Sequence, residues 1–150
     1  MADIKSAEQR SKNMSKIRGI DTEPEVWLRK RLFSKGIRYR KNEKDLPGSP
    51  DLWISKYNTA VFVHGCFWHR HKDCRFAYTP KSNVEFWKSK FEANIARDTR
   101  VCSELLEKNV RVLIVWECTV KRMKHSEKER ENVIQRILSF LNSEGTMLEI

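Results

Sequence analysis

Residues 60–74 read Ala-Val-Phe-Val-His-Gly-Cys-Phe-Trp-His-Arg-His-Lys-Asp-Cys, an apolar run followed at once by a dense set of possible metal ligands. The continuous apolar run 60–63 predicts a central strand buried on both faces. His64 follows, and residues 65–74 then carry two cysteines, two histidines and two adjacent aromatics. Core packing does not explain so many nitrogen and sulfur ligands in one short loop, so the segment indicates a metal site.

The ligand spacing points to zinc. Cys66, His71 and Cys74 follow the pattern C-x₄-H-x₂-C. Cys118 is the expected fourth ligand, because it comes just past a second apolar strand and strand ends gather at one edge of an α/β sheet. Three thiolates and one imidazole suit tetrahedral zinc with no open position, so we expect a structural ion that fixes the loop to the sheet. The alternative is a set of unrelated buried thiols, which is our interpretation of Cys102.

Charge and composition narrow the class of protein. The 150 residues include 30 Lys and Arg against 20 Asp and Glu, a formal charge of +10. Such an excess favours a polyanionic partner, which is DNA, RNA or an anionic membrane. The hydrophobic share of 39% is that of a globular chain, with neither a membrane-spanning apolar run nor a signal peptide. We therefore expect one cytoplasmic domain over residues 1–150, with ligand or buried cysteines rather than disulfides.

The remaining pattern predicts helices packed on a mixed sheet. A helix should begin at Thr22, where Thr22 can cap and Glu25 completes a capping box, and should end at Gly36. The other expected elements are a basic helix or arm over 6–19, strands at 37–40, 51–54, 60–63 and 110–116, and helices at 83–108 and 127–142. Their order, α-α-β-β-β-α-β-α, predicts an α/β fold.

Four residues are candidates for phosphodiester chemistry: Asp51, His64, His69 and Asp98. Asp51 lies at the start of one strand and beside the strand that ends at His64, where a carboxylate can hold Mg²⁺ for hydrolysis. Histidine side chains ordinarily change charge near neutral pH, so His69 can act as the base, while His64 can hydrogen-bond the phosphate. Asp98, on the long helix, can orient one of the histidines. Alternatively, Asp51 is a turn residue after Gly-Ser-Pro.

The chain contains several long and unusual strings: Arg10-Ser11-Lys12-Asn13-Met14, Asp21-Thr22, Leu46-Pro47-Gly48, Pro50-Asp51, His64-Gly65-Cys66-Phe67-Trp68-His69, Glu85-Phe86-Trp87 and Arg111-Val112-Leu113-Ile114-Val115-Trp116-Glu117-Cys118. With these strings, residues 8–120 resemble the very-short-patch repair endonucleases, which nick DNA at T:G mismatches. The resemblance implies a restriction-endonuclease-like fold, with a mixed central sheet flanked by helices. It also implies a structural zinc at Cys66, His71, Cys74 and Cys118.

The resemblance further implies catalytic roles. Asp51 and residue 63 would hold Mg²⁺, and His69 would be the general base, supported by His64 and Glu25. Position 63 is Val where the family pattern has Thr; this is harmless if the ligand is the backbone carbonyl of Val63, whereas a hydroxyl ligand would be lost. The chain also lacks the D/E-x-K motif of related nucleases on this strand, so the histidines would replace its lysine.

The resemblance also implies that side chains insert into the DNA duplex as a wedge. Phe67 and Trp68 would enter the duplex beside the mismatch from the major groove, and Met14 would enter from the other side. A T:G pair costs less to unstack than a matched pair, so insertion would favour the mismatch. Judged from the residues alone, all three could instead pack internally. Residues 1–20 would form an N-terminal arm that clamps DNA and contacts it through Arg10, Lys12, Asn13 and Met14.

The leading hypothesis is a Mg²⁺-dependent endonuclease that nicks one strand 5′ to the thymine of a T:G mismatch, in repair of deaminated 5-methylcytosine. The alternatives are a restriction-type endonuclease acting on matched DNA and a zinc-stabilised DNA-binding module without catalysis. The expected partners are double-stranded DNA with a T:G mismatch, mismatch-repair proteins and a cytosine-5 methyltransferase. We expect a bacterial monomer in the cytoplasm, at the nucleoid when acting, with no membrane association.

Overall fold

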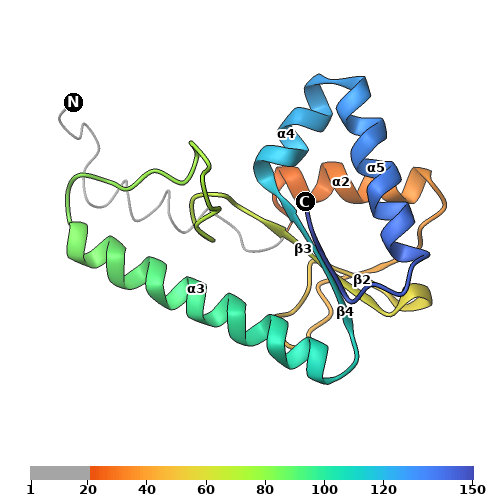
Figure 1. Ribbon diagram of the computed structural model, residues 1–150, viewed down its shortest axis with the longest axis horizontal. Coiled ribbons are helices and arrows are strands. Elements are labelled where there is room, and N and C mark those ends of the chain that lie inside the picture. The colour runs from red at the N-terminus through yellow and green to blue at the C-terminus, as the bar shows by residue number, and fades with distance from the viewer. Residues whose placement is uncertain (1–20) are drawn as a thin grey trace.

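The computed structural model describes residues 21–150, so the expected arm with Arg10, Lys12, Asn13 and Met14 lies outside the described residues. A five-stranded mixed sheet forms the centre, and helices lie on both of its faces (Figure 1). The strands, in spatial order, are β1 (Arg40–Lys41), β2 (Leu52–Ile54), β3 (Thr59–His64), β4 (Arg111–Trp116) and β5 (Met147–Glu149). The helices are α2 (Glu23–Ser34), α3 (Val84–Glu107), α4 (Glu117–His125) and α5 (Glu127–Leu141), and a 3₁₀ turn covers Ser55–Tyr57.

The sheet is antiparallel on one side and parallel on the other. β1, β2 and β3 pair antiparallel, whereas β3, β4 and β5 pair parallel. The crossover from β3 to β4 contains the ligand-rich loop and α3, so both parallel strands end at the same edge, at His64 and Trp116. That edge is where a parallel arrangement collects loop residues into a site. The mixed α/β class expected from the sequence is confirmed.

Two apolar layers cover the two faces of the sheet. Val61, Leu113 and Val115 point to the face covered by α2, α4 and α5. Ala60, Phe62 and their β4 neighbours point to the other face, together with residues of α3 and the ligand-rich loop. The alternation of side chains along each strand accounts for this division, because β3 and β4 are apolar on both faces.

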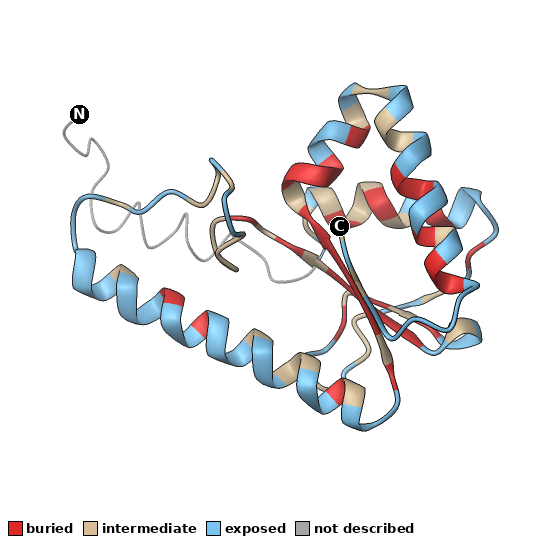
Figure 2. Ribbon diagram, in the orientation of Figure 1, coloured by how far each residue is buried: buried red, intermediate tan, exposed pale blue. Residues whose placement is uncertain are grey.

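Only part of α3 packs on the sheet. Along its 24 residues, Phe91, Asn94 and Leu105 are buried, and most of the helix is exposed (Figure 2). The apolar side chains of Phe86 and Ile95 are 59% and 47% exposed. The N-terminal half of α3 therefore extends beyond the sheet and leaves apolar side chains available on the surface.

The structure differs from the sequence-based expectation in several elements. The strand expected at 37–40 is instead Arg40–Lys41, and both α4 and β5 were missed. α4 begins directly after β4, with no linker to separate the two patterns. Thr22 makes no side-chain hydrogen bond at the start of α2, so that part of the capping-box prediction is wrong. None of the helices in the described part of the chain is both long and apolar enough to cross a membrane.

Candidate active site

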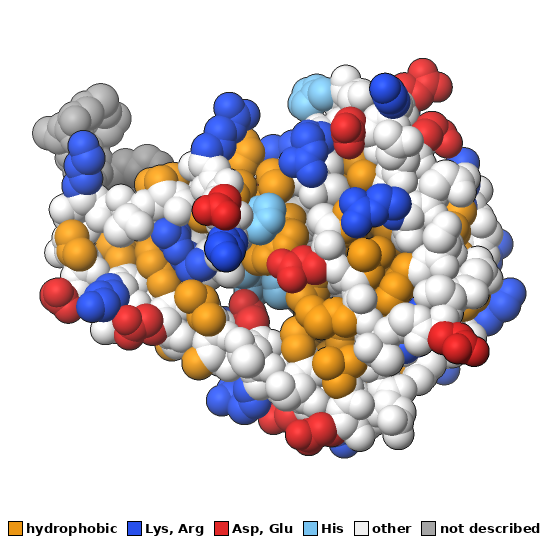
Figure 3. Space-filling model, in the orientation of Figure 1, with side chains coloured by type: hydrophobic (Ala, Val, Ile, Leu, Met, Phe, Trp, Pro, Cys, Tyr) orange, Lys and Arg blue, Asp and Glu red, His pale blue; other side chains and the backbone are white. Residues whose placement is uncertain are grey.

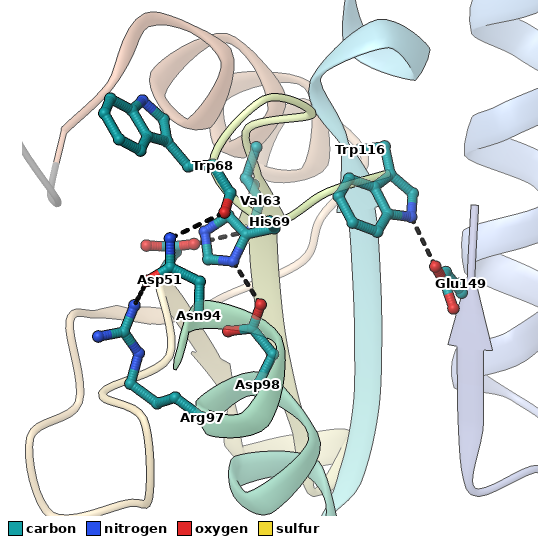
Figure 4. Close-up of polar contacts among 9 residues, drawn as sticks. All are labelled: Asp51, Val63, Trp68, His69, Asn94, Arg97, Asp98, Trp116 and Glu149. Carbon is teal, nitrogen blue, oxygen red and sulfur yellow. Dashed lines mark hydrogen bonds and ion pairs between the residues drawn. The ribbon is translucent and has the colours of Figure 1, made fainter. Parts of the chain in front are cut away.

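A cavity of about 290 Å³ lies between the end of β3, the loop before β2, and α3. Its lining brings together the residues that the sequence suggested for hydrolysis: Asp51, Val63, His64, His69 and Asp98. Figure 4 shows Asp51, His69 and Asp98 close to one another, on the loop before β2, the loop that follows β3 and α3 respectively. Residues separated by nearly fifty positions therefore share one cavity, because the β3–α3 crossover folds back over the end of the strand.

Asp51 stands at the wall of this cavity, and the backbone N–H of Val63 donates to its Oδ2 at 2.7 Å. Burial raises the pKa of Asp51 to about 7, and the neighbouring charge of Glu25 adds to the rise. A buried carboxylate that is this hard to ionise gains most from a divalent cation, since the cation offsets the cost of burying the charge. The Val63 side chain has no oxygen, so its backbone carbonyl is the group that can join Asp51 on a metal.

Glu25 is brought to the same region by α2. It is 1% exposed, and Arg29, one turn further along α2, lies 3.4 Å from its Oε1. Burial raises the pKa of Glu25. Since Glu25 raises the pKa of Asp51, the two carboxylates repel each other through the protein interior. Paired acids of this kind make the region favourable for a cation.

His69 is held by Asp98. Its Nδ1 lies 2.7 Å from Asp98 Oδ2, and both residues are half-buried. The carboxylate accepts a hydrogen bond from Nδ1–H, which leaves Nε2 as the basic nitrogen of the neutral ring. Asp98 therefore both orients the imidazole and selects its tautomer.

His64 packs flat against His69. The ring centroids are 3.9 Å apart and the planes differ by 5°. Burial lowers the pKa of His64 to about 3, and the charge of His69 acts in the same direction. The ligand atoms of His64, His69 and Asp98 lie within 4.8 Å of one another. Parallel stacked rings direct their in-plane lone pairs side by side, however, so one ion at roughly 2.1 Å cannot meet both.

The histidine pair also separates two cavities. A second cavity of about 430 Å³ lies between α3 and the strands β4 and β5, and it shares His64, His69 and Asp98 with the first. Figure 3 shows the molecule hollowed between α3 and the sheet, with histidine side chains in the hollow and Lys and Arg side chains around it.

A second cluster has the geometry of a metal centre. Sulfur or nitrogen atoms of Cys66, His71, Cys74 and Cys118 all lie within 4.8 Å of one another. His71 Nδ1 is 3.6 Å from Cys66 Sγ and 3.4 Å from Cys118 Sγ. Tetrahedral zinc with ordinary bond lengths predicts roughly 3.6 Å for such a nitrogen–sulfur edge. The four residues expected as ligands thus fit a tetrahedral ion, and the loop spacing that suggested them is compatible with this geometry.

Trp116 lies between the two centres, a connection that the sequence did not reveal. Its indole stacks on His71, with centroids 4.1 Å apart and planes within 9°, and it meets His64 edge to face at 5.3 Å. The indole Nε1 donates to Glu149 Oε1 at 2.8 Å. Glu149 belongs to β5, so the missed strand fixes the side chain that joins the two centres.

The aromatics of the loop form a cluster with α3. Phe67 packs edge to face on Trp68 and on Phe91, at 5.1 and 5.2 Å, and Trp87 lies 5.8 Å from Trp68. Phe67 and Trp68 are half-buried, and neither belongs to the two apolar layers of the sheet. Figure 4 shows Trp68 directed away from His69 and Asp98. The string Glu85-Phe86-Trp87 was the available signal for Trp87.

Two polar residues of α3 also belong to the site and were missed. Asn94, which is buried, donates from Nδ2 to the carbonyl of Trp68 at 3.0 Å. Arg97 donates to Asn94 Oδ1 at 2.9 Å and lines the cavity of Asp51. With Asp98, these residues follow the i, i+3, i+4 spacing of one helix face. That spacing was the only signal, and polar residues on a long helix more often face solvent.

Comparison with known proteins gives consistent results. The family model described as DNA mismatch endonuclease Vsr matches residues 2–75. The chain is 46% identical over 136 residues to the type II nicking enzyme V.NmeAIP of Neisseria meningitidis, an alignment that covers 91% of this chain and 96% of that protein. It is 40% identical to the type II nicking enzyme V.XorIIP of Xanthomonas oryzae, with coverage of 89% and 98%.

The DNA mismatch endonuclease Vsr of Escherichia coli is 38% identical over 151 aligned residues, covering 100% of this chain and 94% of that enzyme. Similarity that extends along both chains at this level confirms the resemblance to the very-short-patch repair endonucleases. The chain therefore belongs to the DNA mismatch endonuclease Vsr family and is a DNA endonuclease.

Proposed function

We propose that this endonuclease nicks one strand of double-stranded DNA 5′ to the thymine of a T:G mismatch, with Mg²⁺ at Asp51 and a structural zinc ion in the cysteine cluster. One observation carries the proposal. The loop that bears Phe67 and Trp68 also bears His69, so a wedge that senses the mismatch and a base that cuts beside it lie on adjacent residues. The names of the relatives support the nicking of DNA, and one of them is a mismatch endonuclease.

Hydrolysis requires a base for the attacking water. His69 Nε2 is available for this role because Asp98 occupies Nδ1 at 2.7 Å. His69 accepts the water proton while the new phosphorus–oxygen bond forms and the bond to O3′ breaks, leaving a 3′-hydroxyl and a 5′-phosphate. His64 supports the His69 ring through the 3.9 Å stack, and in its neutral form it can donate one hydrogen bond to the phosphate.

Asp51 and the backbone carbonyl of Val63 would hold Mg²⁺, with Glu25 adding negative charge nearby. When bound, the cation would supply positive charge to the scissile phosphate. The raised pKa of Asp51 supports this assignment, because a buried acid beside a second carboxylate is poorly stabilised without a cation. Carboxylate and carbonyl oxygens suit Mg²⁺ rather than a metal that prefers thiolate ligands.

Zinc at Cys66, His71, Cys74 and Cys118 would leave no open position, so its role would be structural. It would fix both ends of the loop that carries the wedge and the base to the start of α4. Phe67 and Trp68 could then unstack the weak T:G pair without collapsing inward. The rest of the clamp would come from residues 1–20, with Met14 on the opposite side of the duplex and Arg10, Lys12 and Asn13 on the backbone.

We further propose a single endonuclease domain over residues 1–150 that is related in fold to the type II restriction enzymes. The mixed sheet, with the acidic centre at the end of β3, supports this relation. A monomer acting at the bacterial nucleoid, beside mismatch-repair proteins and a cytosine-5 methyltransferase, is the corresponding biological setting.

A nicking assay tests this function. The wild-type enzyme and Asp51→Ala should be incubated with Mg²⁺ and two duplexes that differ only in T:G against C:G. We expect one nick, 5′ to the mispaired thymine, in the wild type, and binding without nicking in the variant. Equal nicking of both duplexes would favour a restriction-type enzyme instead, and nicking of neither despite tight binding would favour a DNA-binding module.

A further inference from the structure

Arg97 occupies a particular position in the catalytic cavity. It reaches the cavity from α3, and of the described residues that line this cavity it is the one Lys or Arg. Figure 4 shows its guanidinium extending toward Asn94, on the same side of His69 as Asp51. The residue as a whole is exposed, so its charge lies at the mouth of the cavity, where DNA would enter.

The Arg97 guanidinium is positioned without being neutralised. One nitrogen donates to Asn94 Oδ1 at 2.9 Å. Within residues 21–150, no carboxylate lies within 4.0 Å of it, although the next residue, Asp98, pairs with His69. A guanidinium has five N–H donors in a rigid planar fork, so most of them remain available for an anion.

We propose that Arg97 is a catalytic residue of the nicking reaction, which donates hydrogen bonds to the non-bridging oxygens of the scissile phosphate and stabilises the transition state. The proposal rests on the function proposed above. The phosphoryl group gains negative charge as water attacks, and fixed donors directed at that charge are among the strongest contributors to catalysis. Arginine suits this position because its fork matches two phosphate oxygens at once.

The histidines cannot easily supply this charge. His69 must be neutral to accept the water proton, and His64 stacks on it at 3.9 Å, where two positive rings would repel each other. The lysine that related nucleases carry near their acidic residues has no counterpart on β3. Arg97 would supply its charge from α3 instead, on the opposite wall of the cavity.

Comparison with Arg70, an arginine of the loop after β3, shows why position matters. Arg70 also lies close to the histidines, but its guanidinium donates to the carbonyls of Phe67, Ala77 and Tyr78. Those hydrogen bonds stabilise the loop conformation, so the guanidinium of Arg70 has a structural role. Among residues 21–150, Arg97 has a single hydrogen-bond acceptor, Asn94, and Asn94 also donates to the Trp68 carbonyl, which fixes the guanidinium relative to the base.

The step balances without a proton from Arg97. The water oxygen bonds to phosphorus as its proton passes to His69 Nε2. The electron pair of the P–O3′ bond leaves on O3′, which takes a proton from solvent. Arg97 stays protonated throughout and acts by hydrogen bonding alone, because a guanidinium is not deprotonated in proteins.

The test compares Arg97→Gln with Arg100→Gln. Arg100 lies on the same helix, 66% exposed, 4.0 Å from Glu104 and outside the cavity lining, so it controls for a lost surface charge. Single-turnover nicking at saturating enzyme should fall about 10²–10³-fold in Arg97→Gln, with Kd for DNA changed less than about 3-fold. Arg100→Gln should match the wild type in both measurements.

Chemical rescue separates catalysis from structure. Added ethylguanidinium should raise the nicking rate of Arg97→Ala at least about 10-fold above the rate of the same variant without it, because the cation can occupy the emptied space and contact the phosphate. A rate within 3-fold of wild type for Arg97→Gln would overturn the proposal. So would a loss that appears only in Kd. The rates are measured on whichever duplex the wild type nicks, so failure of T:G preference would refute the function without deciding the role of Arg97.

Discussion

Trp116 stacks face to face on His71, with ring centroids 4.1 Å apart, and so places a side chain of the sheet directly against a residue of the candidate zinc centre. The same indole meets His64 edge to face at 5.3 Å. The two centres are therefore in contact through one residue. A change at the candidate zinc centre can reach the candidate catalytic histidines through rigid packing rather than through a long chain of intermediates.

Replacement of Trp116 should expose this connection. Trp116→Phe keeps an aromatic ring between the histidines but loses the Nε1 bond to Glu149, so we expect a nicking rate within about 3-fold of wild type. Trp116→Leu loses the stack on His71, and the resulting movement of His64 should lower the rate about 10-fold. Single-turnover kinetics, with zinc content measured in parallel, checks both. A Leu variant that nicks at the wild-type rate would show that the contact has no functional role.

A separate prediction concerns the metal content of the cysteine cluster. Cys118→Ser should lose zinc and at least about 3 kcal/mol of stability, because the loop would no longer be fixed to the start of α4. Cys102→Ser is the matched control, since Cys102 is half-buried and lies outside the cluster of four candidate ligands. Elemental analysis and thermal unfolding measure the two effects. Full zinc content in Cys118→Ser would refute the four-ligand assignment.

Asp51 should make the wild type less stable as the pH rises. Its pKa is about 7 in the folded protein against 3.8 for the ordinary side chain, so the folded state binds more protons between these values. The stability contribution of the protonated form is complete below about pH 4 and is lost as the pH rises through 7. At pH 8 without added Mg²⁺, Asp51→Asn should therefore be about 2–4 kcal/mol more stable than the wild type.

The pH dependence supplies the control for this prediction. At pH 5 the advantage of Asp51→Asn should shrink, because the wild-type carboxyl is then largely protonated. Added Mg²⁺ at pH 8 should also reduce it, by stabilising the ionised wild type. Denaturant unfolding measures all of these values. An advantage of equal size at pH 5 and pH 8 would mean that the charge of Asp51 is not its cause.

Gly48 should be required for the approach of the Asp51 loop to α3. It has φ of +75°, and a Cβ there would lie 2.4 Å from Val101 Cγ1. Gly36 has φ of +86° but nothing within 4 Å of such a Cβ. Both Gly→Ala variants incur backbone strain, and only Gly48→Ala adds a clash, so it should be about 1–3 kcal/mol less stable than Gly36→Ala. Equal unfolding free energies in the two variants would contradict this packing.

The long apolar runs made β3 and β4 predictable, because each is apolar on both faces and ends at a turn or ligand. The short strand β5 gave little such signal. Its three residues are half-buried or exposed, and backbone bonds such as Ile150 N–H to the Ile114 carbonyl extend its pairing with β4. Backbone pairing leaves no pattern in the side chains, so sequence reasoning missed β5 and, with it, Glu149.

The residues of the candidate site were likewise predictable only in part. The candidate ligands Cys66, His71 and Cys74 share one loop and could be found by spacing. Asn94 and Arg97 become part of the site only because α3 docks across the end of β3, and nothing in their local sequence separates them from polar residues that face solvent. Long-range packing of this kind decides which helical side chains enter a cavity.

The most direct test of the account is the ratio of nicking rates on T:G and C:G duplexes, measured under single-turnover conditions for the wild type and for Trp68→Ala. If the aromatic loop senses the mismatch, the wild-type ratio should be large, and Trp68→Ala should reduce it about 10-fold or more while Kd for the matched duplex changes less. A ratio in Trp68→Ala equal to that of the wild type would contradict the claim that one loop both senses the mismatch and carries the base that cuts beside it.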